Sequence, residues 1–242
     1  MAAWFKPPLE PALSRVPTTQ PAVALTFDDG PAVPYTARIL DLLLGAHARA
    51  TFFVLGTEAV KHPELVRQLA AAGMELGLHG LDHRDVRRLG ARAAVAQAVA
   101  ERDLLARIVP HVRIGLFRPP YGTTTPGLAS LLGQHHLSLV LWDVDTRDWT
   151  RPSVAAIVRR VEQAVRPGSI VLFHDGGGNR QETVQAIARL LPWFSAHGYR
   201  LVTVSQLVEL AAPPLPPPSP SQAKSAIVGA EPSAGVAGRG PV

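Results

Sequence analysis

The apolar positions between residues 20 and 210 follow two alternating patterns. Short runs rich in β-branched and aromatic residues predict seven strands, at 23–27, 50–55, 74–79, 114–117, 138–142, 169–173 and 200–204. Apolar residues that recur every three or four positions predict six helices, at 35–44, 63–72, 91–109, 126–132, 152–165 and 182–197. Pro63, Pro126 and Pro152 stand where three helices begin, and Gly73 and Gly198 follow the ends of two.

Strands that alternate with helices predict a parallel sheet, because parallel neighbours need a crossover connection that is usually helical. Two α/β architectures fit this pattern: a partly open (β/α) barrel with about seven parallel strands, and an open doubly wound sheet. The first strand is followed by Phe-Asp-Asp-Gly-Pro at 27–31, and not by a glycine-rich loop that binds phosphates. The sequence therefore argues against a nucleotide-binding sheet.

Shifts in composition divide the chain into three parts. Its 242 residues suit one large α/β domain, which we place at 21–210. Residues 1–20 are proline-rich, and we expect an N-terminal arm that lies on the domain surface. Residues 211–242 include eight prolines and four glycines, which predicts a Pro/Gly-rich disordered tail. Its PPLPPPSP run fits a linker better than a polyproline recruitment motif.

The chain has no cysteine, which excludes disulfide scaffolds, iron–sulfur clusters, thiolate zinc sites and cysteine nucleophiles. Any metal ion must therefore be held by His, Asp or Glu. The net charge of +5 comes mainly from arginines that are spread singly or in pairs along the chain. Since no long basic run is present, we expect a solvated basic surface and no nucleic-acid partner.

No apolar stretch reaches the roughly 20 residues that a transmembrane helix needs, so we expect no transmembrane segment. The first residues, MAAWFKPPLEPALSRVP, lack the basic and apolar regions of a secretory signal. As written, the sequence favours a cytoplasmic protein. If its N-terminus is incomplete, the cell envelope and secretion are the alternatives.

Ionisable residues gather at the carboxyl ends of the predicted strands. In chain order they are Asp28 and Asp29, His79 and His83, Arg118, Asp145 and Asp148, and His174 and Asp175. Active sites of barrels and of open α/β sheets are built at this edge. Random placement would scatter polar residues over both edges, so the pattern favours an enzyme.

The first two groups also have ordinary structural explanations. Asp28 and Asp29 fit an Asp-Gly turn, but one carboxylate could instead bind a cation while its neighbour handles a proton. His79 and His83 fit two surface histidines beside a turn. Alternatively, the two imidazoles and one of the carboxylates make a three-ligand metal site with open positions for water. The spacing is not that of helical zinc proteases, because Gly80 disfavours a helix and no glutamate follows the first histidine.

The later groups leave similar choices open. Arg118, stiffened by two following prolines, either makes a structural salt bridge or tethers an active-site carboxylate through two hydrogen bonds. Asp143, Asp145 and Asp148 form either a helix-capping loop or the source of a carboxylate that raises the pKa of a catalytic histidine. His174 is either a core histidine or that catalytic residue. Six other histidines are expected to be structural: His47, His62, His111, His135, His136 and His197.

Taken in order, these motifs resemble those of the polysaccharide deacetylases, which form carbohydrate esterase family 4 and share the NodB-type homology domain. The resemblance lies in Thr-Phe-Asp-Asp-Gly at 26–30, His79 with His83, Arg-Pro-Pro-Tyr at 118–121, residues 145–149, and Leu-Phe-His at 172–174. Residues 50–54 are also similar to that family's second strand. The resemblance covers about residues 20 to 210 and implies a distorted, partly open (β/α) barrel.

The resemblance also implies one divalent metal ion, usually zinc and in some members cobalt or nickel. The family's ligands match Asp29, His79 and His83 of this chain. The family commonly has Ser or Thr after the first histidine, whose hydroxyl steadies the metal loop, whereas this chain has Gly80. This departure bears on the rigidity of the loop and on metal affinity, but not on the identity of the ligands.

The resemblance assigns a role to six further residues. They are Asp28 as catalytic base, Arg118 orienting that base, His174 as catalytic acid, Asp148 tuning that acid, the Tyr121 backbone amide as an oxyanion donor, and Trp149 lining a pocket for the acetyl methyl group.

The expected activity is metal-dependent removal of N-acetyl groups from an N-acetylglucosamine-containing glycan, such as chitin oligomers or peptidoglycan, with release of acetate. One alternative is a related hydrolase of O-acetyl esters or of cyclic amides and imides. Another is a non-catalytic carbohydrate-binding or scaffold domain. The expected partner is a glycan or oligosaccharide, and the sequence leaves the oligomeric state open. The tail contributes only +1 (Lys224 and Arg239 against Glu231), so the folded part carries the basic charge, which favours an anionic cell-wall polymer.

Overall fold

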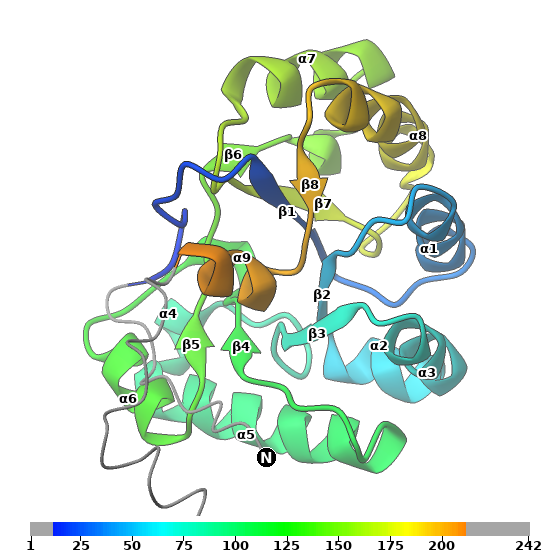
Figure 1. Cartoon of the computed structure of the whole chain (residues 1–242). Helices are drawn as coiled ribbons and strands as arrows, with labels where there is room; N and C mark the ends of the chain where they lie inside the picture. The colour runs from blue at the N-terminus through cyan, green and yellow to red at the C-terminus, as the bar shows by residue number, and fades with distance from the viewer. Residues whose placement is uncertain (1–11, 212–242) are drawn as a thin grey trace, which may run out of the picture. The chain divides into compact units, whose positions relative to one another are not determined.

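The computed structural model describes residues 12–211, in which a parallel β-sheet is surrounded by helices (Figure 1). Its strands are β1 (Ala22–Asp28), β2 (Thr51–Val54), β3 (Glu75–Leu78), β4 (Leu116–Phe117), β5 (Ser138–Leu139), β6 (Val144–Asp145), β7 (Ile170–His174) and β8 (Arg200–Leu201). The strand order is β5-β4-β3-β2-β1-β7-β6, and β8 pairs with the first residues of β1. The strands at the two ends of this order do not pair with each other. The fold is the distorted, partly open (β/α) barrel that the sequence predicts.

The described part of the N-terminal arm lies at the open side of this sheet. Leu13 forms a parallel bridge with Val140, just after β5, and Arg15 forms an antiparallel bridge with Ser169, just before β7. Val16 is buried in a small hydrophobic cluster with residues of β1 and β7. Residues 12–16 therefore connect the two sides of the opening and are more deeply integrated than a surface arm. Residues 1–11 lie outside the described residues.

Nine α-helices and two 3₁₀ turns are present within residues 12–211. The helices are α1 (Tyr35–Gly45), α2 (Gly56–Lys61), α3 (Pro63–Ala71), α4 (Val86–Leu89), α5 (Ala91–Ile108), α6 (Leu128–Gln134), α7 (Val154–Ala164), α8 (Gln181–Ala196) and α9 (Val204–Ala211). The 3₁₀ turns are η1 (Pro120–Gly122) and η2 (Asp148–Thr150). All six predicted helices are present. However, α6 and α7 begin two residues after Pro126 and Pro152. Helix α7 begins there because Ser153 is its N-cap residue, and the Ser153 hydroxyl accepts a hydrogen bond from the Ala156 N–H.

The core between sheet and helices is organised by aromatic residues that share one level of the sheet. Phe27 of β1 is paired in register with Phe52 of β2 and Phe173 of β7. Its ring stacks on theirs at centroid distances of 4.9 and 5.7 Å. Such pairs add about 0.5–1.5 kcal/mol beyond the burial of their area. They lock the relative positions of three strands, and thereby of the residues that follow at their carboxyl ends.

The sequence-based prediction was wrong in four places. It placed one strand at 138–142, where only β5 lies, and it left β6 in the loop that follows. Each of these two strands has only two residues, which are too few to show a hydrophobic period. It missed the short helices α2 and α4. It also extended the last strand to residue 204, where α9 begins. Thr203 and Gln206 form a capping box there, since each backbone N–H bonds to the other's side chain, at 3.0 and 3.2 Å.

The predicted tail begins one residue too early, because Ala211 is the last residue of α9. Residues 212–242, where we expect disorder, lie outside the described residues. Among residues 12–211, no helix has the length and apolar character to cross a membrane.

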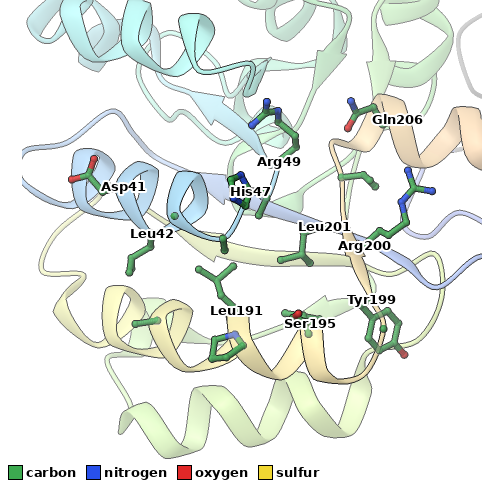
Figure 2. Close-up of a pocket in the computed structure, with 18 of the residues that line it drawn as sticks. Asp41, Leu42, His47, Arg49, Leu191, Ser195, Tyr199, Arg200, Leu201 and Gln206 are labelled. Carbon is green, nitrogen blue, oxygen red and sulfur yellow. The ribbon is translucent and has the colours of Figure 1, made fainter.

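A groove of about 1450 Å³ lies at the amino ends of the strands, between the carboxyl ends of α1 and α8 and strand β8 (Figure 2). His47, Arg49, Tyr199, Arg200 and Gln206 line it. None of the candidate site residues contributes to this groove. In barrels the amino edge mainly serves stability, so the chemistry is sought at the opposite edge.

Candidate active site

The register of the sheet gathers the predicted residues at its carboxyl edge. Asp28, the last residue of β1, is paired with His174, the last residue of β7. Leu78 of β3 is paired with Phe117 of β4, so the next residues, His79 and Arg118, also leave the sheet side by side. Parallel pairing thus brings together four residues from four segments of the chain.

Asp29, His79 and His83 form a cluster that could hold a metal ion. Each offers one ligand atom, and the three atoms lie within 4.8 Å of one another. Asp29 Oδ1 is 3.4 Å from His79 Nε2 and 3.1 Å from His83 Nε2. Asp29 and His83 have φ angles of 72° and 59°, in the left-handed region that residues other than glycine seldom adopt. Such backbone strain is typical of functional sites.

The chemistry of this cluster fits a divalent cation. Asp29 Oδ1 is buried and has no well-aligned hydrogen bond among the described residues, which is costly unless a cation satisfies it. His79 Nδ1 lies 2.8 Å from the Arg118 carbonyl oxygen, which only accepts, so Nδ1 carries a proton and Nε2 is the nitrogen that faces Asp29. Although burial raises it, the two imidazoles hold the pKa of Asp29 below its ordinary value. One carboxylate and two imidazoles are ligands that suit Zn²⁺, Co²⁺ or Ni²⁺.

Asp28 is held by a buried arginine. Arg118 has no exposed surface and donates one hydrogen bond of 2.8 Å to Asp28 Oδ1. It also donates to Thr26 Oγ1 and the Leu141 carbonyl, both at 2.8 Å, and stacks over Phe53 at 4.1 Å. Of the two alternatives for Arg118, the tether through two hydrogen bonds to one carboxylate is wrong, because only one oxygen of Asp28 is bound. Asp28 Oδ2 is left facing His79 Nε2 at 3.8 Å.

His174 is held by Asp148. The His174 Nδ1–H donates to Asp148 Oδ1 at 2.7 Å, and its backbone N–H donates to Oδ2 at 2.9 Å. Thr183 on α8 donates a third hydrogen bond to Oδ2, at 2.8 Å. Burial lowers the pKa of His174, but the hydrogen bond and charge of Asp148 outweigh it, so the pKa is raised. Asp148 reaches this position because it follows β6, the strand that we missed and that pairs with β7.

Two other predicted carboxylates lie away from this edge or face solvent. Asp145 is exposed and accepts a hydrogen bond from the Arg147 N–H. Asp143 lies at the amino end of β7, where it accepts from the Ser169 hydroxyl and the Ile170 N–H. Both therefore have structural roles. None of the six histidines that we predicted to be structural belongs to the metal cluster formed within residues 12–211.

Tyr121 lies beside the cluster, Trp149 follows the partner of His174 in the chain, and both remain open to solvent. Tyr121 has a φ of 61°, and its ring packs edge-on against His83 at 4.4 Å. Trp149 follows Asp148 in η2, and residues Tyr121 and Trp149 are 65% and 55% exposed. Their exposure leaves both residues accessible to a substrate.

Sequence reasoning missed two buried carboxyl groups next to the site. Glu101 of α5 accepts hydrogen bonds from the backbone of the metal cluster, and burial raises its pKa well above the ordinary value. Asp175 accepts a hydrogen bond from Thr36, and burial together with the charge of Asp29 raises its pKa to about 7. Asp175 stood among the residues at the strand ends, but no role was assigned to it. Glu101 has no sequence signal, because it lies on a helix 21 residues beyond Gly80.

A family model described as "Polysaccharide deacetylase" matches residues 15–140, which is more than half of the chain. The chain belongs to the polysaccharide deacetylase family. A chitooligosaccharide deacetylase from Sinorhizobium fredii is 36% identical over 202 residues, covering 79% of this chain and 94% of the relative. A peptidoglycan-N-acetylglucosamine deacetylase from Bacillus cereus is 37% identical over 196 residues, covering 80% and 91%.

Solved structures agree with this family assignment. The crystal structure of the peptidoglycan N-acetylglucosamine deacetylase Bc1960 matches with a TM-score of 0.78 and 31% identity, covering 82% of this polysaccharide deacetylase and 92% of that chain. The resemblance to carbohydrate esterase family 4, with its NodB-type domain, is thereby confirmed.

Proposed function

We propose that this polysaccharide deacetylase hydrolyses the N-acetyl group of an N-acetylglucosamine-containing glycan and releases acetate. The observation that carries the proposal is the grouping of three units at one sheet edge: a metal-ligand triad, a carboxylate held by arginine and a histidine held by aspartate. The names of its relatives support chitooligosaccharides or peptidoglycan as the substrate class. The basic charge of the chain suits an anionic cell-wall polymer.

In this proposal Asp29, His79 and His83 hold one divalent metal ion, zinc being the first candidate and cobalt or nickel the alternatives. When bound, such an ion polarises a carbonyl group and lowers the pKa of water from about 16 toward 7. The Asp29 carboxylate suits this role because its pKa is held low, so that it stays charged at neutral pH.

Asp28 is the proposed general base. Its Oδ1 is occupied by Arg118, so Oδ2 is the oxygen available to take a proton from the attacking water. As the proton leaves, the water oxygen bonds to the acetyl carbon and negative charge develops on the carbonyl oxygen. The Tyr121 N–H is proposed to donate to that oxygen, and the exposed Trp149 ring to pack against the acetyl methyl group.

His174 is the proposed general acid. Since its Nδ1–H is engaged by Asp148, the proton it transfers is on Nε2. That proton passes to the amide nitrogen as the C–N bond breaks, which leaves a free amine on the sugar and acetate. The raised pKa favours the protonated imidazole, which is the form that a proton donor requires.

The proposal is tested by acetate release after chelation, with zinc, cobalt or nickel added back. The substrates are chitooligosaccharides, peptidoglycan, acetylated xylan and a cyclic ureide. We expect metal-restored acetate release from the first two. Preference for acetylated xylan or the ureide would favour an O-acetyl esterase or a cyclic amide hydrolase. Stoichiometric metal without hydrolysis of any of the four would contradict an enzyme and favour a carbohydrate-binding domain.

A further inference from the structure

The loop from His79 to His83 carries two of the three metal ligands, and its backbone is fixed at several points. The Gly80 carbonyl accepts from the Gly56 N–H at 3.1 Å, and the Leu81 carbonyl accepts from the Thr57 N–H at 2.9 Å. Both donors are in the first turn of α2, where helix N–H groups lack partners within the helix. Helix α2 therefore holds the carbonyl side of the loop.

The N–H side of the same loop is held by one carboxyl group. Glu101 on α5 is completely buried, and its Oε2 accepts from the Gly80 N–H at 2.7 Å. Its Oε1 accepts at 3.2 Å from the His79 N–H, which also bonds to the Val54 carbonyl at 2.9 Å. The short bond to Gly80 is therefore the main contact that Glu101 makes with the loop.

Packing alone does not explain a carboxyl group at this position. Within residues 12–211, no basic side chain forms a salt bridge with Glu101. Burying an unpaired carboxyl costs several kcal/mol, and an apolar residue of similar volume avoids that cost. The two backbone N–H groups are what this carboxyl binds, and one of them belongs to a metal ligand.

We propose that Glu101 is a positioning residue that fixes the metal-binding loop through the Gly80 N–H; this inference rests on the proposed metal-dependent function. Gly80 has a φ of +90° and no side chain to hold the loop. The carboxyl group of Glu101 supplies a contact to the loop from another helix instead.

Fixing Gly80 matters because the ligand atoms of His79 and His83 must meet Asp29 within a small space. The His79 ring is also held by its bond to the Arg118 carbonyl, so the loop is anchored from two strands and two helices. Groups that orient metal ligands typically change metal affinity or activity by 10- to 100-fold when they are removed.

The test compares Glu101→Met, which keeps the volume but removes both acceptors, with Glu101→Gln, which keeps one acceptor for Gly80. Zinc affinity is measured by competition with a chelator, and the Gly80 amide is followed by NMR in metal-free protein. We expect roughly 10- to 100-fold weaker zinc binding in Glu101→Met and a smaller loss in Glu101→Gln. The Gly80 amide proton should move upfield in Glu101→Met, because it loses a short hydrogen bond to a carboxyl oxygen.

Glu75→Gln is the matched control. Glu75 begins β3, whose other end leads into His79, and it accepts hydrogen bonds from Thr51 and the Ser205 N–H. We expect this variant to lose stability without losing zinc affinity. The inference is overturned if both Glu101 variants bind zinc within twofold of the wild type, or if Glu75→Gln weakens binding equally.

The two proposals fail in different ways. If the wild type binds no divalent metal, the proposed function is wrong, while the Gly80 amide still reports whether Glu101 holds the loop. If the wild type binds zinc and the Gly80 amide is unchanged in Glu101→Met, the function stands and the positioning role is wrong. On the active enzyme, a positioning role lowers kcat in Glu101→Gln and leaves KM near the wild-type value.

Discussion

Asp28 and His174 are paired residues at the ends of two adjacent parallel strands, β1 and β7. Each is oriented by a different partner, Arg118 for Asp28 and Asp148 for His174. The negative charge of Asp28 adds to the effect of Asp148 in raising the pKa of His174. The proposed proton acceptor and the proposed proton donor thus lie on neighbouring strands, and their separate partners allow each to be tested alone.

Replacing Asp28 with Asn tests the proton acceptor. The amide oxygen can still accept from Arg118, but the side chain no longer takes a proton from water. We expect acetate release to fall by roughly 10²- to 10⁴-fold, as is usual when a general base is lost. Metal content, measured by elemental analysis, should be unchanged because Asp28 is not among the ligand atoms of the cluster.

Asp145→Asn is the control for that variant, since Asp145 is an exposed carboxylate at the end of β6. It should retain wild-type activity. Asp28→Asn leaves the buried Arg118 without its counter-charge, which lowers stability. Acetate release by both variants is therefore measured at a temperature well below the midpoint of their thermal unfolding. Activity of Asp28→Asn within tenfold of the wild type would rule out Asp28 as the base.

Replacing Asp148 with Asn tests the proton donor through its pH dependence. The amide oxygen can still accept the Nδ1–H of His174 while the negative charge is lost, although the amide NH2 then replaces the oxygen that accepts from the His174 N–H. The pKa of His174 is raised chiefly by Asp148 against the effect of burial, so removing the charge lowers it. His174 then loses its proton at lower pH, and the alkaline limb of the kcat/KM profile should move to lower pH.

Thr183→Val separates charge from geometry in this test. It removes one hydrogen bond to Asp148 and keeps the carboxylate charge. We expect a loss of about 1 kcal/mol in stability and an unchanged alkaline limb. If Asp148→Asn and Thr183→Val shift the pH profile of kcat/KM equally, its alkaline limb does not report the charge of Asp148.

The sequence predicted those site residues that are ionisable and that lie at or just after the carboxyl end of a predicted strand. The residue pattern predicted a cluster of His79 and His83 with either Asp28 or Asp29, and the family resemblance selected Asp29. The sheet brings this cluster together because Asp29 and His79 directly follow the ends of β1 and β3, and His83 lies on the loop after His79. The residue pattern alone narrowed the partner of His174 to Asp143, Asp145 or Asp148, and only the family resemblance selected Asp148. Hydrophobic patterning could not make that choice, because it depends on β6, a two-residue strand that is too short to show a hydrophobic period.

Contacts between distant elements were not predictable. Nothing near Glu101 in the sequence distinguishes it from a surface glutamate of a helix, and only the packing of α5 on the sheet buries it under Gly80. The same holds for Thr183, which reaches Asp148 from α8. Local patterns thus predicted the residues that leave the strands, whereas those that support them from helices required the tertiary structure.

Arg118 offers a third prediction, on stability and rate together. Its guanidinium binds Asp28, Thr26 and the Leu141 carbonyl in different directions, which the single ammonium of lysine does not match. Arg118→Met should lose about 3–5 kcal/mol in urea unfolding, because it leaves Asp28 buried and unpaired. Arg118→Lys should lose less stability but still lower kcat, by about tenfold or more, with a small change in KM. A normal kcat in Arg118→Lys would show that a nearby positive charge is sufficient.

Asp175 provides a prediction about stability and pH that does not depend on the reaction. Its pKa rises from 3.8 to about 7 on folding, chiefly because it is buried. Between these values the folded protein keeps a proton that the unfolded chain has lost, so the free energy of unfolding should fall as pH rises from about 4 to 7. The loss is at most about 4 kcal/mol, at 1.36 kcal/mol per pKa unit.

Asp175→Asn should remove this contribution, because the amide does not ionise and its oxygen can still accept from Thr36. Unfolding is followed in urea with chelated protein at several pH values between 4 and 8, since a bound cation would change the charge around Asp29. The variant should gain stability relative to the wild type as pH rises, whereas Asp41→Asn, at an exposed position of α1, should track the wild type throughout. A constant difference between Asp175→Asn and the wild type from pH 4 to 8 would mean that Asp175 is already ionised in the folded protein. Its carboxylate would then have to be stabilised by a group other than Thr36.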